Sequence, residues 1–569
     1  MLSLEQLRKY GSFSDMNKIN ITIKDMPAST CSIGTTVAEL MPAKQDEQGR
    51  SYIAALVNND LVSLTYPLTV NSKLTFITAA SHHGWRIYRN SLCFLLGKAV
   101  NDIFPDADFA VEHSFGPGLF CSLTLDGISK ADTESLNSIE KRMRELIEED
   151  CHIERRKISF LDAIEIFGSC GMMEELNLLR YRNPPHVVVN TCRGFSALSH
   201  HPLVQSSGVL EYFKLIPYPP GFVLQMPLQE NPETIPEFED QPHLFKIFQE
   251  HKKWGRILNV ATAGRLNQIT AEGKVAGFIR TAEALHDKKL SRIADRITER
   301  SHSTKVVLIA GPSSAGKTTF SKRLATHLRV TGLQPLTIST DDYFVGKDRN
   351  PVGEDGKPDY EHIEAVDIEA FNRDLTDLID GKPVPIRRFN FETKLPEYLD
   401  DKLELGHDHI LIIEGIHGLN PRLTKDIPSD RKFKIYVSAL TQLNLDPNNR
   451  ISTTDNRLIR RMVRDRQFRG HSALETLRMW PMVRRGEEKW VFPFQKEADA
   501  TFNSALDYEL AVLKPFVEPL LMQVKPSSPE YAEARRLSGF LLNFLAIQNE
   551  LVPPDSILRE YIGGSNLEY

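Results

Sequence analysis

The chain has 569 residues, 41% of them hydrophobic and 25% charged, and its formal net charge is −6. This length exceeds what a single hydrophobic core usually serves, so we expect several domains. A mildly acidic chain with no basic excess argues against nucleic acid as a partner. The six cysteines lie within the first 200 residues without C-x-x-C spacing, which indicates neither a disulfide framework nor a zinc knuckle and favours a reducing compartment.

The sequence carries no pattern typical of secretion or membrane insertion. Its first residues, MLSLEQLRKYGSFSD, are polar and lack the apolar core of a signal peptide. The most apolar stretches, such as Val306–Ala310 and 410–413, are far shorter than the roughly 20 residues needed to cross a bilayer. We therefore expect a cytoplasmic protein with no membrane partner.

Residues 17–80 show short alternating segments separated by turn residues. Alternation at Lys18–Ile23 and at 73–77 predicts strands, and residues 36–40 predict the start of a short helix.

Helical patterns and a boundary signal follow in the next part of the chain. We expect helices at 92–103 and, with an amphipathic pattern, around 135–149. The segment 229–243 is rich in prolines and acids, which predicts a domain boundary near it. A helical segment, 266–299, then leads into the second half.

A phosphate-binding loop is predicted where the second half begins. Residues 305–310 read as a buried strand, the next eight match G-x-x-x-x-G-K-[ST], and 320–328 read as a helix. In such a loop successive backbone N–H groups and the helix N-terminus point at phosphate oxygens. Lys317 should reach the β- and γ-phosphates, and the Thr318 hydroxyl should ligate Mg²⁺. The predicted ATP-binding residues are Gly311, Pro312, Ser313, Ser314, Ala315, Gly316, Lys317, Thr318 and Thr319.

Acidic residues end the next two predicted strands. Asp341 and Asp342 follow 336–340, and Glu414 ends 409–413. A carboxylate at the first position can accept the proton of an attacking hydroxyl, although a capping or turn aspartate gives the same pattern. Glu414 stands where a second acid would help to hold Mg²⁺ through water.

Arginines recur at helical spacing further along the chain. Arg457, Arg460, Arg461 and Arg464 share one predicted helix face. Such a face could bind nucleic acid or simply be solvated. Beside a phosphate-binding loop, the more economical interpretation is a lid whose guanidiniums neutralise a transferring phosphoryl group.

Together these residues resemble the uridine kinase and phosphoribulokinase family over about residues 300–505. The resemblance implies a parallel sheet flanked by helices and Mg²⁺-dependent phosphoryl transfer from ATP. The matching segments are the loop Gly311–Thr318, Ser339-Thr-Asp341, Asp359-Tyr-Glu361 through Asp367, Glu414-Gly-Ile, Asp455-x-Arg457 through Asp465, Arg469-Gly470 and Ala498-Asp499.

The resemblance also implies residue roles. Asp341 is the general base, and Lys317, Arg464 and Arg469 complete the catalytic set. Thr318 and Glu414 serve Mg²⁺, the latter through water. The implied substrate-binding residues are Phe344, Glu361, Arg387, Glu392, Arg461 and Arg464.

Two departures from the family pattern leave the acceptor open. Uridine kinases usually carry Tyr-Asp-Phe after Pro385 and then a histidine, whereas this chain has Arg387-Arg388-Phe389 and then Glu392. The acid that usually grips the ribose hydroxyls as aspartate is here Glu361.

The first half resembles other proteins. Residues 17–80 are similar to a TGS domain, a small β-grasp fold, and 81–225 to the editing-associated α+β domain of threonyl-tRNA synthetases. That domain normally carries H-x-x-x-H and C-x-x-x-H. The corresponding positions here are Asn90, Phe94, Cys192 and Ser196, so we expect neither zinc nor deacylation.

These observations predict an α/β protein with five parts: a TGS-like domain (17–80), a synthetase-like domain (81–228), a linker and helical segment (229–300), a kinase domain (301–520) and a C-terminal helical tail (521–569). The predicted function is an ATP-dependent nucleoside 5′-kinase of uridine or cytidine type, with a nucleoside as its small-molecule partner; a homo-oligomer is left open. Arg387, Arg388 and Glu392 motivate an alternative sugar or phosphosugar acceptor. A third interpretation is an RNA-associated regulatory factor whose loop only senses nucleotide.

Overall fold

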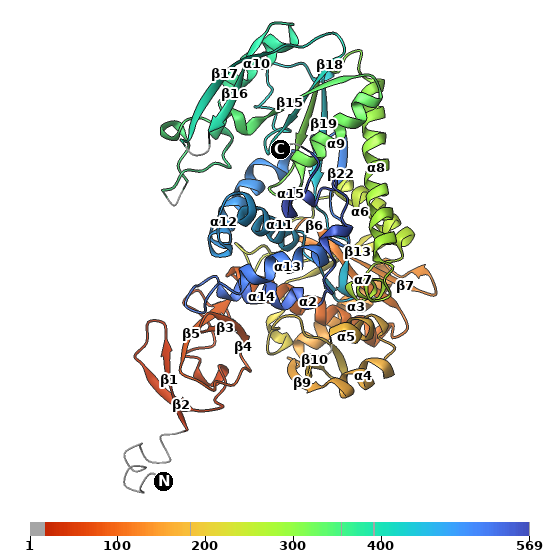
Figure 1. Ribbon diagram of the computed structural model, residues 1–569. Helices are drawn as coiled ribbons and strands as arrows, with labels where there is room; N and C mark the ends of the chain where they lie inside the picture. Colours follow the sequence, from red (N-terminus) through yellow and green to blue (C-terminus); the bar gives the residue numbers. More distant parts are fainter. Residues whose placement is uncertain (1–16, 183, 354–355, 391–392, 568–569) are drawn as a thin grey trace.

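The computed structural model describes residues 17–182, 184–353, 356–390 and 393–567. Figure 1 shows the small N-terminal sheet at one end of the molecule and the parallel sheet of the second half at the other, with α13 and α14 between them. Among the described residues, no helix combines the length and apolarity that a bilayer crossing requires.

The N-terminal unit is a β-grasp fold, as predicted. Its sheet has the order β2-β1-β5-β3-β4, with the central β1 and β5 parallel. Ile19 and Ile21 point into the core because they alternate with polar residues along β1. The predicted short helix is a single 3-10 turn, Ala38–Leu40. The strands are β1 (Lys18–Ile23), β2 (Ser29–Ser32), β3 (Tyr52–Val57), β4 (Asp60–Ser63) and β5 (Ser72–Thr78).

An α+β unit follows, with two antiparallel sheets of order β12-β13-β7-β6 and β11-β10-β9; β8 pairs with β7. Its first helix, α2, starts ten residues before the predicted 92, because the Ser81 hydroxyl accepts a hydrogen bond from the Gly84 N–H and caps it there. The elements are α2 (His82–Ile103), β6 (Asp108–Phe115), β7 (Gly118–Leu125), β8 (Ile128–Ser129), α3 (Thr133–Glu148), β9 (Glu154–Ser159), α4 (Phe160–Ser169), α5 (Met173–Arg182), β10 (His186–Cys192), β11 (Phe195–Leu198), β12 (Lys214–Tyr218) and β13 (Gly221–Gln225).

Three helices connect the halves: α6 (Pro242–Leu258), α7 (Ala263–Ala271) and α8 (Val275–Glu299). The predicted helical segment 266–299 contains two helices, α7 and α8, and Gly273 between them adopts a φ of +71°. Buried residues of α8 belong to the same hydrophobic core as the second half. This segment is therefore packed against the domain that follows it.

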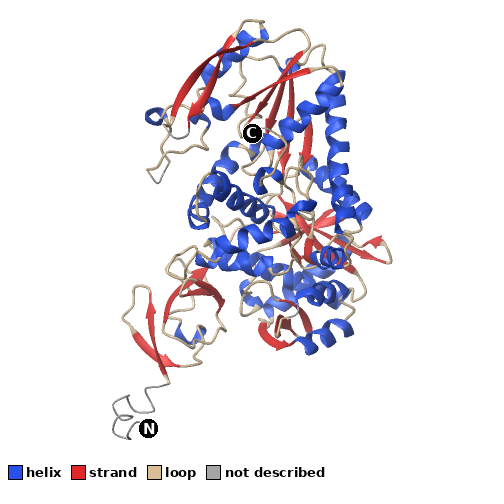
Figure 2. Cartoon of the chain, viewed as in Figure 1, coloured by secondary structure: helices blue, strands red, loops and turns tan. Residues whose placement is uncertain are grey.

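The second half contains a five-stranded parallel sheet of order β15-β18-β14-β19-β22. Figure 2 shows this sheet flanked by helices, which confirms the predicted α/β class. All five residues of the central strand β14 are buried, and the carboxyl ends of β14, β15 and β18 meet at one edge. The elements are β14 (Val306–Ala310), α9 (Lys317–Val330), β15 (Gln334–Ser339), α10 (Ile368–Ile379), β16 (Val384–Asn390), β17 (Leu395–Leu403), β18 (His409–Glu414), β19 (Lys432–Ser438) and β22 (Ala500–Asn503).

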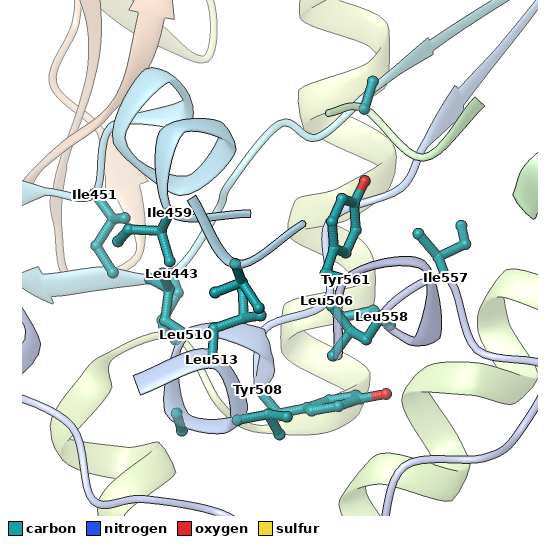
Figure 3. Close-up of a cluster of buried hydrophobic side chains, with 14 of the residues drawn as sticks. Leu443, Ile451, Ile459, Leu506, Tyr508, Leu510, Leu513, Ile557, Leu558 and Tyr561 are labelled. Atoms are coloured by element: carbon teal, nitrogen blue, oxygen red, sulfur yellow. The ribbon is translucent and has the colours of Figure 1, made fainter. Parts of the chain in front are cut away.

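The remaining elements complete the second half. They are β20 (Asn444–Asp446), β21 (Asn449–Arg450), α11 (Thr453–Phe468), α12 (Ala473–Trp490), α13 (Glu509–Leu521), α14 (Tyr531–Leu541) and α15 (Arg559–Ile562). Figure 3 shows Ile557, Leu558 and Tyr561 of the C-terminal segment in one apolar cluster with residues of α11 and α13. The tail predicted from residue 521 is thus built into the core of the second half, while the five domain boundaries stay predictions.

Candidate active site

The phosphate-binding loop lies between β14 and α9, as the motif predicts. Gly316 caps α9 with a φ of +80°, a conformation that glycine adopts without strain. A Cβ on Gly311 would lie 1.9 Å from the carbonyl oxygen of Val437 on β19. Both motif glycines are therefore required by the backbone geometry.

Helices α11 and α12 close over this loop through polar contacts. The Ser313 N–H donates to Glu487 Oε1 at 2.9 Å, and Arg461 Nη1 donates to Ser313 Oγ at 2.8 Å. Lys317 Nζ donates to the Pro312 carbonyl at 3.2 Å. The loop is held in a defined conformation, with the lysine turned back along it.

Asp341 faces the cationic groups of the site. Although the Asp341 side chain is accessible to solvent, the protein atoms that surround it raise its pKa. The charges of Lys317, Arg469 and Arg464 oppose that rise. The four residues predicted to be catalytic therefore lie within electrostatic reach of one another. A carboxylate with a raised pKa beside a phosphate loop is suited to accept a proton.

Asp342 contacts a different part of the domain, the backbone of β16. Burial raises its pKa, and a hydrogen bond from the backbone of Phe389 on β16 opposes that rise. The two aspartates have different neighbours, and both lie in a 3-10 turn, Thr340–Tyr343, after β15 has ended. The turn begins where Ser339 Oγ accepts a hydrogen bond from the Asp341 N–H.

A set of oxygen atoms at the loop edge suits Mg²⁺. Glu414 Oε1 accepts hydrogen bonds from Thr318 Oγ1 at 3.4 Å and from Ser339 Oγ at 3.2 Å. Burial, with the negative charge of Asp341, raises the pKa of Glu414 to about 7. In the described ranges no group of three or more His, Cys, Asp or Glu side chains could hold a metal. An Mg²⁺ here would take a hydroxyl and a carboxylate from the protein and complete its shell with phosphate and water oxygens.

The arginine face of α11 is buried rather than solvated. Arg457 makes two hydrogen bonds to Glu487, and Arg460 Nε donates to Glu509 Oε2 at 2.6 Å. These guanidiniums are held inside the protein and present no exposed basic surface to nucleic acid. Arg464 is half-buried, and its Nε has no hydrogen-bond partner among the described residues.

Phe344 and Arg387, both predicted to bind the acceptor, contact each other. Phe344 packs against Phe389, with ring centroids 5.6 Å apart. Arg387 is buried. It donates a hydrogen bond to the Phe344 carbonyl at 3.3 Å and pairs with Asp367 at 3.5 Å. Its guanidinium is thus committed to the domain interior. Glu392 lies outside the described residues.

Glu361, which is predicted to bind the acceptor, is a half-buried acid. Its Oε2 has no hydrogen-bond partner among the described residues. Burial and the nearby Glu487 raise its pKa to about 7, although Arg461 and Lys317 oppose the rise. A Cβ on Gly486 of α12 would lie only 2.3 Å from the Glu361 Cβ.

Three residues that contact the loop could not be found from the sequence. Glu487 belongs to no motif, and only the packing of α12 brings it to Ser313. Glu560 is 241 residues from Thr319, yet its Oε2 accepts a hydrogen bond from the Thr319 hydroxyl at 2.8 Å. Tyr561 donates to the Ser314 carbonyl at 3.0 Å. The C-terminal segment therefore completes the wall of the phosphate site.

The phosphate-binding loop, Asp341 and the arginines predicted to be catalytic lie together at one site. Residues 306–511 match the Phosphoribulokinase / Uridine kinase family and form a domain of that family. The prediction of an ATP-dependent phosphotransferase is thereby confirmed.

The N-terminal region is similar to part of other enzymes. A threonine–tRNA ligase of Desulforamulus reducens is 29% identical over 201 residues, which cover 35% of this chain and 31% of that protein. One from Acidovorax sp. is 26% identical over 254 residues, covering 42% and 39%. The chain spans about a third of the length of these curated relatives.

Similar solved structures include kinases. One is described as a possible uridine kinase from Bacillus stearothermophilus, with 16% identity, a TM-score of 0.26 and coverage of 37% of this chain and 98% of that chain. Another is a D-glycerate 3-kinase from Cryptococcus neoformans, with 14% identity, a TM-score of 0.20 and coverage of 45% and 87%.

Proposed function

We propose that the protein is an ATP-dependent nucleoside 5′-kinase with a pyrimidine nucleoside, of the uridine or cytidine type, as its acceptor. The observation that carries this proposal is the placement of two acids. Asp341 faces the cationic residues of the phosphate side, and Glu361 offers a buried carboxylate oxygen without a partner among the described residues. A ribose supplies a 5′-hydroxyl for the first acid and a pair of hydroxyl donors for the second.

In the proposed reaction the 5′-hydroxyl oxygen attacks the γ-phosphorus of ATP. A bond from that oxygen to phosphorus forms, the bond from phosphorus to the β,γ-bridging oxygen breaks, and ADP leaves. Asp341 takes the hydroxyl proton. Lys317 binds β- and γ-phosphate oxygens, and Arg464 and Arg469 neutralise charge on the transferring group. Mg²⁺ held beside Thr318 and Glu414 supplies further charge neutralisation when bound.

The structure weakens the motive for a phosphosugar acceptor. Arg387 is paired with Asp367 and bonded to the Phe344 carbonyl, so it is not free to bind a phosphate on the acceptor. The RNA-associated alternative is disfavoured because the α11 arginines are engaged inside the domain.

ATP consumption against a panel of nucleosides, sugars and phosphosugars tests the proposal, with the product identified by ³¹P NMR. We expect turnover with uridine or cytidine and loss of that turnover in Lys317→Ala, whose thermal unfolding should match that of the parent. Turnover of the variant within tenfold of the parent would exclude this loop as the catalytic site. Phosphorylation of a sugar in place of every nucleoside would overturn the proposed acceptor.

A further inference from the structure

A cavity of about 640 Å³ lies outside the kinase site and is lined by residues of β4, α2, α5 and α14, among others. We call it the junction cavity. It is joined to a smaller space of about 40 Å³ by shared wall residues that include Arg86 and His201. Seven arginines contribute to the walls of the pair: Arg86, Arg155, Arg182, Arg535 and Arg536 line the large cavity, and Arg89 and Arg450 line the small one, together with Arg86 and Arg536.

Part of this positive charge is neutralised by acids of the protein. Arg86 pairs with Glu533 at 2.7 Å, and Arg536 pairs with both Glu533 and Asp455. Arg535 pairs with Asp60 at 2.9 Å. These three guanidiniums are fixed in place and need no ligand.

Three other arginines of the walls lack such partners. Arg155, at the exposed rim, donates to Ser199 Oγ at 3.2 Å, and Arg182 donates to Asn543 Oδ1 at 3.2 Å. Arg89 lies over the Trp85 ring at 5.1 Å. No carboxylate in the described parts of the chain lies within ion-pair distance of these three. Burial, with the charges of Arg450 and Arg86, lowers the pKa of Arg89 to about 9.

Polar atoms in the same walls are also without partners. His83 Nδ1 and Arg450 Nε are buried and have no hydrogen-bond partner among the described residues. His201 is held neutral, because burial and the charge of Arg536 bring its pKa well below the usual range. Groups of this kind inside a protein normally find a partner, and here the space beside them is open.

We infer that the junction cavity is a binding site for a small phosphorylated molecule, whose phosphate is taken by the arginines that lack acidic partners. Guanidiniums bind phosphate through paired charge-assisted hydrogen bonds. The volume lies within the range of about 300–1,000 Å³ typical of small-molecule sites. An RNA would need an exposed basic stripe instead, and the chain is acidic overall.

The position of the site couples it to both halves of the protein. Arg536 holds Asp455 in the first turn of α11, and Arg461 on the same helix bonds Ser313 of the phosphate loop. A ligand in the cavity touches α2 and α5 from the first half and α14 from the second. Its binding therefore stabilises their association and raises the Tm of the whole chain.

Calorimetric titration of the full chain tests the inference, with inorganic pyrophosphate, uridine 5′-monophosphate and ribose 5-phosphate as probes and uridine as the uncharged comparison. We expect at least one phosphorylated probe to bind, and its Kd to rise at least tenfold in Arg155→Ala/Arg182→Ala. Arg156→Ala, the next position on β9, should leave the Kd unchanged. So should Lys317→Ala, which separates the junction cavity from the phosphate loop.

The stability of the double variant separates ligand binding from a structural role. Because neither arginine pairs with an acid, its removal leaves no orphaned carboxylate, and the unliganded Tm should stay the same or rise. A large fall in Tm would show that these arginines serve the fold. Arg182→Lys, which keeps the charge, should then still bind the probe if the inference holds. Binding that is lost in Lys317→Ala, no binding of any probe below 1 mM, or binding of transfer RNA alone would overturn it.

Discussion

Glu560 and Thr319 are joined at the phosphate site, although 241 residues separate them in sequence. Glu560 Oε2 accepts hydrogen bonds from the Thr319 hydroxyl at 2.8 Å and from its backbone N–H at 3.4 Å. That N–H belongs to the first turn of α9, where phosphate oxygens bind in loops of this kind. A carboxylate therefore stands where a nucleotide phosphate is expected, and Arg464 Nη1 lies 3.4 Å from its other oxygen.

Glu560→Ala should therefore tighten ATP binding. The substitution removes a negative charge that competes with phosphate for Thr319 and Arg464, while Ile557, Leu558 and Tyr561 keep the segment in the core. We expect the Kd for ATP to fall by about tenfold, equal to about 1.4 kcal/mol. Glu550→Ala, an exposed acid of the same segment, is the control in the same titration. A weaker affinity in Glu560→Ala would show instead that the carboxylate supports the loop.

The pH dependence of acceptor use should report Glu361. Its pKa is raised to about 7, so the side chain is neutral at lower pH and gains its second strong acceptor oxygen as pH rises through that value. We expect kcat/KM for the nucleoside to rise across this range and to flatten in Glu361→Gln. Glu361→Ala should raise the KM for the nucleoside by about 10- to 100-fold through lost charge-assisted hydrogen bonds, with the KM for ATP changed far less. Equal effects on both substrates would assign the residue to the fold or the metal.

Gly486→Ala tests whether α12 positions Glu361. Alanine ordinarily stabilises a helix interior by about 1 kcal/mol relative to glycine. Here the added Cβ would lie 2.3 Å from the Glu361 Cβ, so Glu361 must shift. We expect a higher KM for the nucleoside and a lower Tm. Gly168→Ala in α4, where nothing lies within 4 Å, is the matched control and should raise the Tm. An unchanged acceptor KM in Gly486→Ala would show that the position of Glu361 is not critical.

The site residues that could be predicted from the sequence are those whose positions depend on local spacing. Loop glycines, the acid after β15 and the acid ending β18 follow from strand–loop–helix patterns, because parallel strands bring their carboxyl ends to one edge. Glu487 and Glu560 reach the loop only through the packing of α12 and of the C-terminal segment, which no short motif encodes. The sequence also did not indicate the direction of individual side chains. Nothing in the pattern around Arg387 indicates that it turns inward to Asp367.

The two aspartates after β15 provide the sharpest test of the mechanism. Asp341 lies within reach of the charges of Lys317, Arg464 and Arg469, whereas Asp342 is bonded to the backbone of β16. Asp341→Asn keeps the shape of the side chain but cannot take the acceptor proton. Loss of a general base should lower kcat by about 10²–10⁴-fold, with ATP affinity changed far less. Asp342→Asn should be milder, because an amide oxygen can still accept the hydrogen bond from Phe389.

Both variants should be compared by kcat and by ATP affinity under saturating Mg²⁺, because Asp341→Asn also removes negative charge beside Glu414. Saturating Mg²⁺ offsets any weaker metal binding that this loss of charge causes. A fall in kcat at saturating Mg²⁺ therefore reports proton transfer. If Asp342→Asn proves the more damaging variant, the base is the residue that faces β16. If neither variant lowers kcat even tenfold, the catalytic centre lies elsewhere than at the end of β15.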